Sequence, residues 1–192
     1  MDSATFAPPR IERLNAADAD AAVPALVDIL IDCVEGGASV SFMRPMTQDK
    51  ARGFWRAVLD SAARGERIVL VARDDGGVPF GTVQVVTDLP ENQPHRGDVA
   101  KMLVHRRARR RGVARSLMQA AEAAAREAGR TLLVLDTVTG GAAESLYAQL
   151  GWLRCGVIPG YALMPDGEPC ATTVFYKSLA NLGSGVREPT QS

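Results

Sequence analysis

The residues with the clearest chemical potential lie in a glycine turn rich in arginine. Residues 109–114 read Arg-Arg-Arg-Gly-Val-Ala, between an apolar run at 98–104 that predicts a strand and an alanine-rich run at 114–128 that predicts a helix. Such a turn presents unpaired backbone N–H groups at the positive end of a helix dipole, which favours a phosphate or pyrophosphate. Six arginines add positive charge there, at positions 106, 107, 109, 110, 111 and 115. The alternative is a solvated basic turn that only begins a helix.

The length and charge of the chain limit the classes of protein to consider. The chain has 192 residues, 46% of them hydrophobic, and its formal net charge is zero. This length favours one domain with a sizeable core. A neutral chain argues against a dedicated nucleic-acid binder, which usually carries an excess of basic residues.

The cysteines and histidines predict neither a disulfide framework nor a metal site. Cys33, Cys155 and Cys170 are widely spaced, which favours reduced thiols and a cytoplasmic location. Together with only His95 and His105 they do not make a zinc site. The best apolar run, at 23–34, is too short for a membrane span and contains two aspartates, and the N-terminus lacks the pattern of a signal peptide.

Hydrophobic periodicity and turn residues predict a single α/β domain over residues 10–179. Strands are expected at 10–14, 67–73, 80–86, 98–104, 131–136, 152–158 and 172–177, and helices at about 15–34, 48–64, 114–128 and 142–150. An antiparallel hairpin followed by a strand–helix–strand crossover predicts a mixed, mostly antiparallel sheet of about six or seven strands with helices on both faces. We expect a flexible N-terminus at 1–9, a loop at 159–169 and a disordered tail at 180–192.

Two motifs resemble the GNAT acetyltransferase superfamily. In the first, an apolar strand end precedes a pattern whose key positions are filled here by Arg109, Gly112 and Ala114. The second is a helix end that reads Leu-Tyr-x-x-Leu-Gly-aromatic, at residues 146–152. The motifs occur in the family's order, and the order of predicted elements also agrees with the GNAT fold.

A narrower resemblance is to the tabtoxin-resistance acetyltransferase branch of that superfamily. It is carried by residues 36–40, 98–104, 135–137, 159–161 with 165–167, and 175–177. The resemblance implies a small, amino-acid-like antimetabolite or toxin as one type of acceptor.

The resemblance implies that acetyl-CoA enters between two diverging strands, at 98–104 and 131–136. Backbone groups of Met102, Leu103 and Val104 would then bond the pantetheine arm. The pyrophosphate would meet the turn and the first helical residues, namely Arg109, Arg110, Arg111, Gly112, Val113, Ala114 and Arg115. Because backbone N–H groups do this binding, we expect Gly112 to matter more than the arginine side chains.

The reaction implied is direct transfer of the acetyl group to an amine, which needs a base for the ammonium proton and an acid for the departing thiolate. Tyr147 aligns with the family's thiolate-facing tyrosine, with an ordinary buried tyrosine as the alternative. Asp98 and Asp136 are the better candidates for the base or for binding the ammonium group, unless they only bond nearby turns. His95 is a weaker candidate, and Glu144 is expected on the surface.

The acceptor site is expected between the first helix, the loop at 36–43 and the loop at 159–169. Ser39 and Tyr161 could supply hydrogen bonds there, as could Asp166, and Phe42 could supply apolar contact together with Met43. These features suit a small polar amine, although the same residues could instead pack a closed lid.

One departure from the family affects the coenzyme site, and two other classes of function remain open. Many GNAT members carry an asparagine where this chain has Gly140, so that contact to the coenzyme is missing or is made by backbone. The alternatives are a non-catalytic acyl-CoA sensor of the same fold and, less favoured, a nucleic-acid-binding module that uses the arginine turn. The apolar first helix could also serve a homodimer interface.

Overall fold

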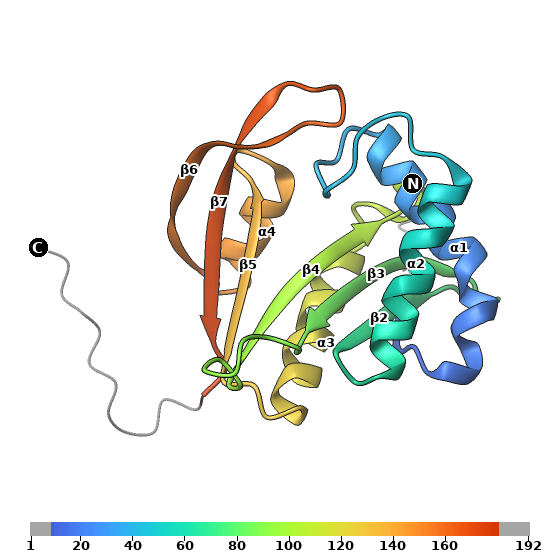
Figure 1. Cartoon of the computed structure of the whole chain (residues 1–192), viewed down its shortest axis with the longest axis horizontal. Coiled ribbons are helices and arrows are strands. Elements are labelled where there is room, and N and C mark those ends of the chain that lie inside the picture. The colour runs from blue at the N-terminus through green and yellow to red at the C-terminus, as the bar shows by residue number, and fades with distance from the viewer. Residues whose placement is uncertain (1–8, 181–192) are drawn as a thin grey trace, which may run out of the picture.

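A computed structural model describes residues 9–180 of the chain as a seven-stranded sheet with helices on both faces (Figure 1). The strands are β1 (Arg10–Arg13), β2 (Arg67–Arg73), β3 (Pro79–Val86), β4 (Arg96–Val104), β5 (Leu132–Val138), β6 (Leu153–Leu163) and β7 (Pro169–Ser178). The helices are α1 (Ala16–Glu35), α2 (Gln48–Ala63), α3 (Val113–Glu127) and α4 (Ala142–Gln149), with a 3-10 turn at Arg106–Ala108.

The sheet has the order β1-β2-β3-β4-β5-β7-β6 and is antiparallel except between β4 and β5. A parallel pair needs a crossover, and α3 supplies it, as the alanine-rich run after the glycine turn predicts. The predicted single-domain α/β fold, with its mixed, mostly antiparallel sheet, is therefore confirmed.

The helices divide between the two faces of the sheet and enclose two cores. Helices α3 and α4 cover one face, where Val99, Leu117, Leu133 and Phe175 are buried. Helices α1 and α2 cover the other face, where Trp55 is buried against apolar residues of α1. Helix α1 continues through Pro24 and agrees with the predicted helix over about residues 15–34.

The parallel pair separates after a short ladder. Strand β4 pairs with β5 from Arg96 with Leu132 to Asp98 with Val134. Beyond these residues the two strands no longer pair with each other, while β4 stays paired with β3 and β5 with β7. On its other side, β4 has one extra residue opposite β3, and this bulge places Lys101 at a φ of 51°. A bulge bends and twists its strand, which turns the end of β4 away from β5.

The predicted loop at 159–169 is wrong for most of its length. Strand β6 continues to Leu163 and β7 begins at Pro169, so only five residues connect them. Strand β6 lies at the edge of the sheet and has two register shifts against β7, and an edge strand with bulges can accommodate a residue such as Pro159. Apart from Pro9 and Ala180, the predicted flexible N-terminus and disordered tail lie outside the described residues.

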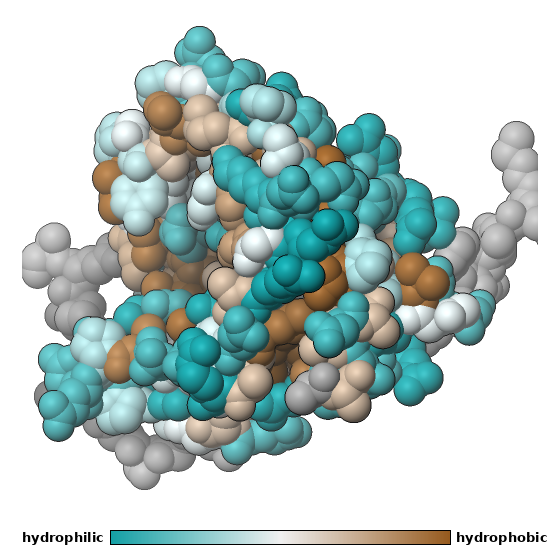
Figure 2. Space-filling model, turned by 45° about the vertical axis from the view of Figure 1, so that its right-hand side comes forward, coloured by the Kyte–Doolittle hydropathy of each residue, from teal (hydrophilic) through white to brown (hydrophobic). Residues whose placement is uncertain are grey.

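The two halves of the sheet are connected at one end by contacts between the β6–β7 turn and the α1–α2 loop. The backbone N–H of Arg44 donates to the carbonyl of Pro165 at 3.0 Å, and the hydroxyl of Ser39 donates to the carbonyl of Leu163 at 2.9 Å. Figure 1 shows this junction at the end of the sheet where β4 and β5 are apart. On the face shown in Figure 2, apolar residues are exposed in small areas between polar ones. No helix within residues 9–180 has the length and apolarity to span a membrane.

Candidate active site

The glycine turn has the backbone geometry that a phosphate site requires. Gly112 is the N-cap residue of α3 with a φ of 74°, and its position has no side-chain cap for the helix. Arg110 also has a positive φ, at 61°. The first N–H groups of α3 therefore point out of a helix end that no side chain of the cap residue closes, next to the gap between β4 and β5.

Asp32 of α1 binds two of the arginines. One of its carboxylate oxygens accepts the backbone N–H of Arg106 at 2.9 Å and the other accepts Nε of the same residue. The guanidinium of Arg109 lies 3.6 Å from Asp32, and its Nε donates to the carbonyl of Val104 at 3.1 Å. These two arginines therefore hold the turn against α1 and the end of β4, instead of serving mainly as free phosphate ligands.

Sequence reasoning missed this role of Asp32. The signal was present, because Asp28 and Asp32 are one helical turn apart in an otherwise apolar run, and a carboxylate on an apolar helix face needs a partner. His105 supplies another contact, with its Nε2 at 3.3 Å from Asp28. Arg115 is also engaged within the protein, since it donates to Gln149 at 3.0 Å.

Replacing Gly112 with alanine is expected to weaken binding of acetyl-CoA about tenfold. Apart from the two neighbouring residues of the chain, no atom lies within 4 Å of the position that a Cβ would take. We expect the substituted turn to relax away from the positive φ in the free protein and to recover it on binding, which costs about 1–2 kcal/mol of binding free energy. Calorimetric titration with acetyl-CoA measures the change, and Arg110→Ala is the matched control in the same turn, with a smaller expected effect. An unchanged Kd for G112A alongside a lower Tm would contradict a binding role for this turn.

The two candidate carboxylates lie on the diverging strands and on one face of the sheet. Val99 and Leu135 point into the core under α3, so the adjacent Asp98 and Asp136 point to the opposite face, toward α1 and α2. Partial burial raises the pKa of Asp98 and the negative charge of Asp136 raises it further, while Arg96, at 2.7 Å, opposes both effects. The structure therefore brings both predicted carboxylates to the same gap.

Tyr147 approaches the same gap from the α4 side. Its side chain is buried, and its ring packs at 5.9 Å from that of Phe175 and 6.1 Å from that of Trp152. Burial, and secondly the charge of Asp136, raise the pKa of Tyr147 to about 12. The hydroxyl is therefore protonated at neutral pH and can donate a proton or hydrogen bond, whereas Asp98 and Asp136 lie on the other face of the sheet.

A buried ion pair anchors the end of α4 that carries Tyr147. Lys177 of β7 donates to both oxygens of Glu122 on α3 at 2.8 Å and to the carbonyl of Leu150 at 2.6 Å. Trp152 also donates to Glu122, at 3.0 Å. Removal of one member of a buried ion pair lowers the free energy of unfolding by about 3–5 kcal/mol. This cluster therefore fixes the position of α4 against α3 and β7.

Glu144 lies at the surface only in part, and its carboxylate is bound by neighbouring groups of the protein. Its side chain is 20% exposed, and its carboxylate accepts the backbone N–H of Gly140 at 2.5 Å and the hydroxyl of Thr173 at 2.9 Å. These bonds, with that of Gly140 first among the causes, lower the pKa of Glu144. The backbone N–H of Gly140, one candidate for a coenzyme contact in place of the family's asparagine, is therefore bound within the protein.

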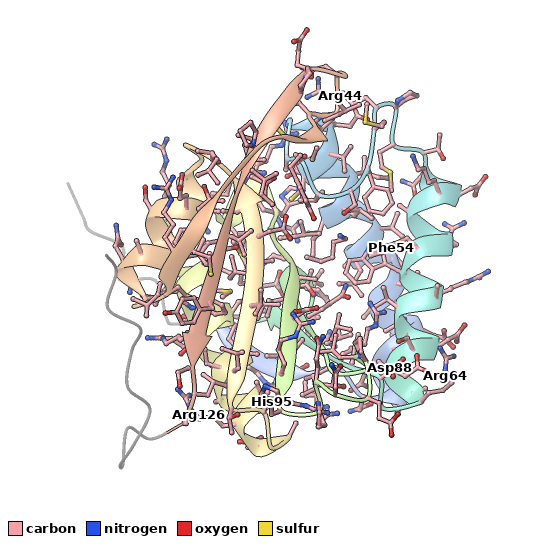
Figure 3. All side chains as sticks on the ribbon, turned by 60° about the vertical axis from the view of Figure 1, so that its left-hand side comes forward. Arg44, Phe54, Arg64, Asp88, His95 and Arg126 are labelled. Atoms are coloured by element: carbon pink, nitrogen blue, oxygen red, sulfur yellow. The ribbon has the colours of Figure 1, made fainter. Side chains whose placement is uncertain are left out.

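His95 lies at the closed end of the parallel pair. Its carbonyl accepts the N–H groups of Thr131 and Leu132, where β4 and β5 are still paired. Figure 3 shows His95 at the end of the molecule opposite Arg44, which belongs to the α1–α2 loop beside the β6–β7 turn. The position of His95 therefore does not support the weaker expectation that it acts as a base.

Three of the predicted acceptor-binding residues, Ser39, Phe42 and Tyr161, differ in their surroundings. Phe42 is half-buried and packs edge-on against Phe54 of α2, with 5.1 Å between ring centroids. The hydroxyl of Ser39 bonds the carbonyl of Leu163, which favours the alternative of lid packing. Tyr161 lies on β6 and is 57% exposed. Of the three, Phe42 is the residue that the structure brings toward the gap, because Lys101 of β4 lies 6.0 Å from its ring.

The gap is bordered by groups of the kinds that bind a thioester. Within residues 9–180, no group of three or more histidine, cysteine, aspartate or glutamate side chains is arranged to hold a metal ion. Beyond the paired residues, β4 and β5 have backbone groups that do not pair with each other, the turn at Gly112 begins a helix without a side-chain cap, and the hydroxyl of Tyr147 on α4 is protonated.

Solved structures of similar shape extend over almost the whole chain. An N-acetyltransferase from Staphylococcus aureus Mu50 is 18% identical, with 91% of this chain and 100% of that chain covered at a TM-score of 0.75. A ribosomal-protein-alanine N-acetyltransferase from Brucella melitensis is 23% identical, with 88% and 99% covered at 0.71. The protein yncA from Salmonella typhimurium, solved with its cofactor acetyl-CoA, is 19% identical, with 94% and 99% covered at 0.73.

At these identities the structures establish the fold, and a sequence match establishes the family. Residues 24–152, which are more than half of the chain and include both motifs, match the profile of the Acetyltransferase (GNAT) family. The chain therefore belongs to the GNAT family and is an acetyl-CoA-dependent N-acetyltransferase.

Proposed function

We propose that this acetyltransferase transfers the acetyl group of acetyl-CoA to the amine of a small polar molecule, in the cytoplasm. The observation that carries the proposal is the gap between β4 and β5, which has the uncapped start of α3 at one end and the side chains of Tyr147, Asp98 and Asp136 beside it. Acetyl-CoA supplies the activated acyl group, and the chain supplies the sites for the two proton transfers.

In this proposal Asp98 or Asp136 accepts the proton of the substrate ammonium, directly or through a water. The free amine nitrogen then forms a bond to the acetyl carbon, the carbon–sulfur bond breaks, and Tyr147 gives its proton to the departing sulfur. The nitrogen of the new amide loses its second proton to water, and Tyr147 regains a proton from water. The carboxylate and the phenol stand on opposite faces of the gap, so base and acid can act on opposite sides of the reacting carbon. No covalent intermediate with the protein is required.

The proposal of a small acceptor rests on the junction at the open end of the gap. The contacts of Ser39 with Leu163 and of Arg44 with Pro165 bridge the two halves of the sheet there and limit the room for a large acceptor. The resemblance to the tabtoxin-resistance branch favours an amino-acid-like antimetabolite, and a structure named as a phosphinothricin N-acetyltransferase has a TM-score of 0.73 to this chain at 19% identity. The Brucella relative is named for a protein substrate, so peptides belong in any test.

The experiment is a turnover screen with acetyl-CoA against small amines, amino acids, polyamines and peptide N-termini, in which released CoA thiol is measured and acetylated products are identified by mass spectrometry. Acetylation of small amines or amino acids, without acetylation of peptides, is the expected result. Binding of acetyl-CoA without any turnover would point instead to the acyl-CoA sensor. Pairing of Arg106 and Arg109 with Asp32 weighs against nucleic-acid binding, which a filter-binding assay at low salt would test.

A further inference from the structure

Lys101 places an ammonium group at the gap between β4 and β5. The proposed proton transfers do not use this group. It lies in the bulge of β4, three residues after Asp98, and is half-buried. A strand of three residues spans about 10 Å, so Lys101 and Asp98 lie within the reach of one small molecule. Lys101 also interacts electrostatically with Asp136 of β5, which counters the lowering of the Lys101 pKa by burial.

Lys101 and the serine that it contacts, Ser41, both have an unusual backbone conformation. Lys101 has a φ of 51°, and Ser41 in the α1–α2 loop has a φ of 76°. Positive φ costs a residue with a side chain about 1–3 kcal/mol, and such residues concentrate at functional sites. The two side chains meet, because Nζ of Lys101 donates to the hydroxyl of Ser41 at 3.0 Å. The strain at these two positions therefore accompanies one defined contact.

The surroundings of the ammonium group are aromatic rather than acidic. Its Nζ lies 6.0 Å from the ring centroid of Phe42 and 5.9 Å from that of Phe54, and Figure 3 shows Phe54 projecting from α2 toward the sheet. Within residues 9–180, Lys101 has no carboxylate at ion-pair distance. A partly buried cation that is held by one hydroxyl and two ring faces retains hydrogen-bonding capacity for an anion.

We propose, on the basis of the proposed function, that Lys101 selects acceptors that carry a carboxylate close to the amine, so that the preferred substrates are free amino acids. The ammonium group of the acceptor faces Asp98 and Asp136, its carboxylate accepts a hydrogen bond from Nζ of Lys101, and its side chain contacts Phe42 and Phe54. Ser41 is a positioning residue that holds Nζ. Opposite charges at the two ends of the site orient the amine toward the gap.

The test compares amino acids with the amines that lack their carboxylate. The pairs are L-leucine with 3-methylbutylamine, L-phenylalanine with 2-phenylethylamine, and L-lysine with 1,5-diaminopentane. Wild-type protein is expected to show a higher kcat/KM for at least one amino acid than for its partner. Lys101→Met is expected to lower kcat/KM for that amino acid about 10- to 100-fold, the effect of losing one charge-assisted hydrogen bond, and to leave the amine within about twofold. The selectivity ratio is kcat/KM for the amino acid divided by kcat/KM for its paired amine. Comparing this ratio between wild type and variant removes any difference in amine basicity within a pair.

Two further variants separate selection from folding. Lys50→Met is the matched control, because Lys50 lies 5.6 Å from the same Phe42 ring but is exposed on α2, and it is expected to leave the ratio unchanged. Ser41→Gly removes the hydroxyl while suiting the positive φ, and it is expected to lower the ratio less than Lys101→Met does. Titration with acetyl-CoA checks that each variant still binds the donor.

The outcomes separate this inference from the proposed function. An equal loss for both members of each pair in Lys101→Met would show that the lysine is structural and would overturn the inference. Equal turnover of amino acids and amines by wild-type protein would also overturn it, while leaving the proposed function intact. Absence of turnover for all amines, with or without binding of acetyl-CoA, would contradict the proposed function itself.

Discussion

Tyr147→Phe is expected to lower kcat about 100-fold, the loss typical of removing a general acid. The pKa of Tyr147, raised to about 12 by burial and by Asp136, keeps the phenol protonated over the whole pH range in which the protein would be assayed. Phenylalanine cannot donate a proton, whereas its ring keeps the contacts with Trp152 and Phe175. Steady-state kinetics with an acceptor found in the turnover screen measures the effect.

The controls for this variant are stability and donor binding. The Tm and the Kd for acetyl-CoA are expected to stay close to the wild-type values, because the exchange removes one hydroxyl and leaves the buried ring in place. A kcat equal to that of the wild type would remove the acid role from Tyr147 and leave it as a packing residue of α4.

Asp98→Asn and Asp136→Asn form the second experiment, and the variant that removes the base is expected to lose about 10²- to 10³-fold in kcat/KM. Asparagine has nearly the same shape as aspartate but cannot accept the proton. The other variant is expected to lose less, with the loss mainly in KM if its carboxylate only attracts the ammonium group. Equal and small losses in both would mean that neither carboxylate is the base.

The pH profile distinguishes Asp98 from Asp136 by way of Arg96. A base must be ionised, so kcat/KM rises with pH through its pKa, and burial together with Asp136 places that rise for Asp98 above the ordinary aspartate range. Arg96, whose guanidinium is 2.7 Å from Asp98, lowers the same pKa. Arg96→Gln is therefore expected to move the acid limb of the profile to higher pH if Asp98 is the base. An unmoved limb would favour Asp136.

Local sequence patterns were sufficient for most of the fold. Periodicity and turn residues predicted strands β1 to β5 and the four α-helices within a few residues, since each element depends on neighbours along the chain. The exception is the hairpin of β6 and β7, where Pro159 and Gly160 predict a loop. Pairing with β7 overrides that local signal, because β6 is an edge strand that can accommodate a proline and register shifts.

The candidate site was predicted in part, and the missing part consists of contacts between distant residues. The position of Gly112 before a helix and the carboxylates at strand ends were readable locally. Asp32 forms ion pairs with Arg106 and Arg109, which lie more than 70 positions away in the sequence. The bond between Lys101 and Ser41 joins residues 60 positions apart. The helical spacing of Asp28 and Asp32 indicates that a carboxylate there needs a partner, but no local pattern identifies the partners in either pairing.

The sequence by itself determined the identity and order of the elements, the glycine turn that begins α3 and the placement of Tyr147 on α4. These follow from backbone conformational preference and from hydrophobic periods of two and 3.6 residues. Only the tertiary structure decided that Asp32 binds Arg106 and Arg109, that Ser39 bonds the β6–β7 hairpin, and that Lys101 faces Phe42 and Phe54. The physical reason is that a charged or polar side chain bonds whichever partner folding brings within a few ångströms, and chain distance does not reveal that partner.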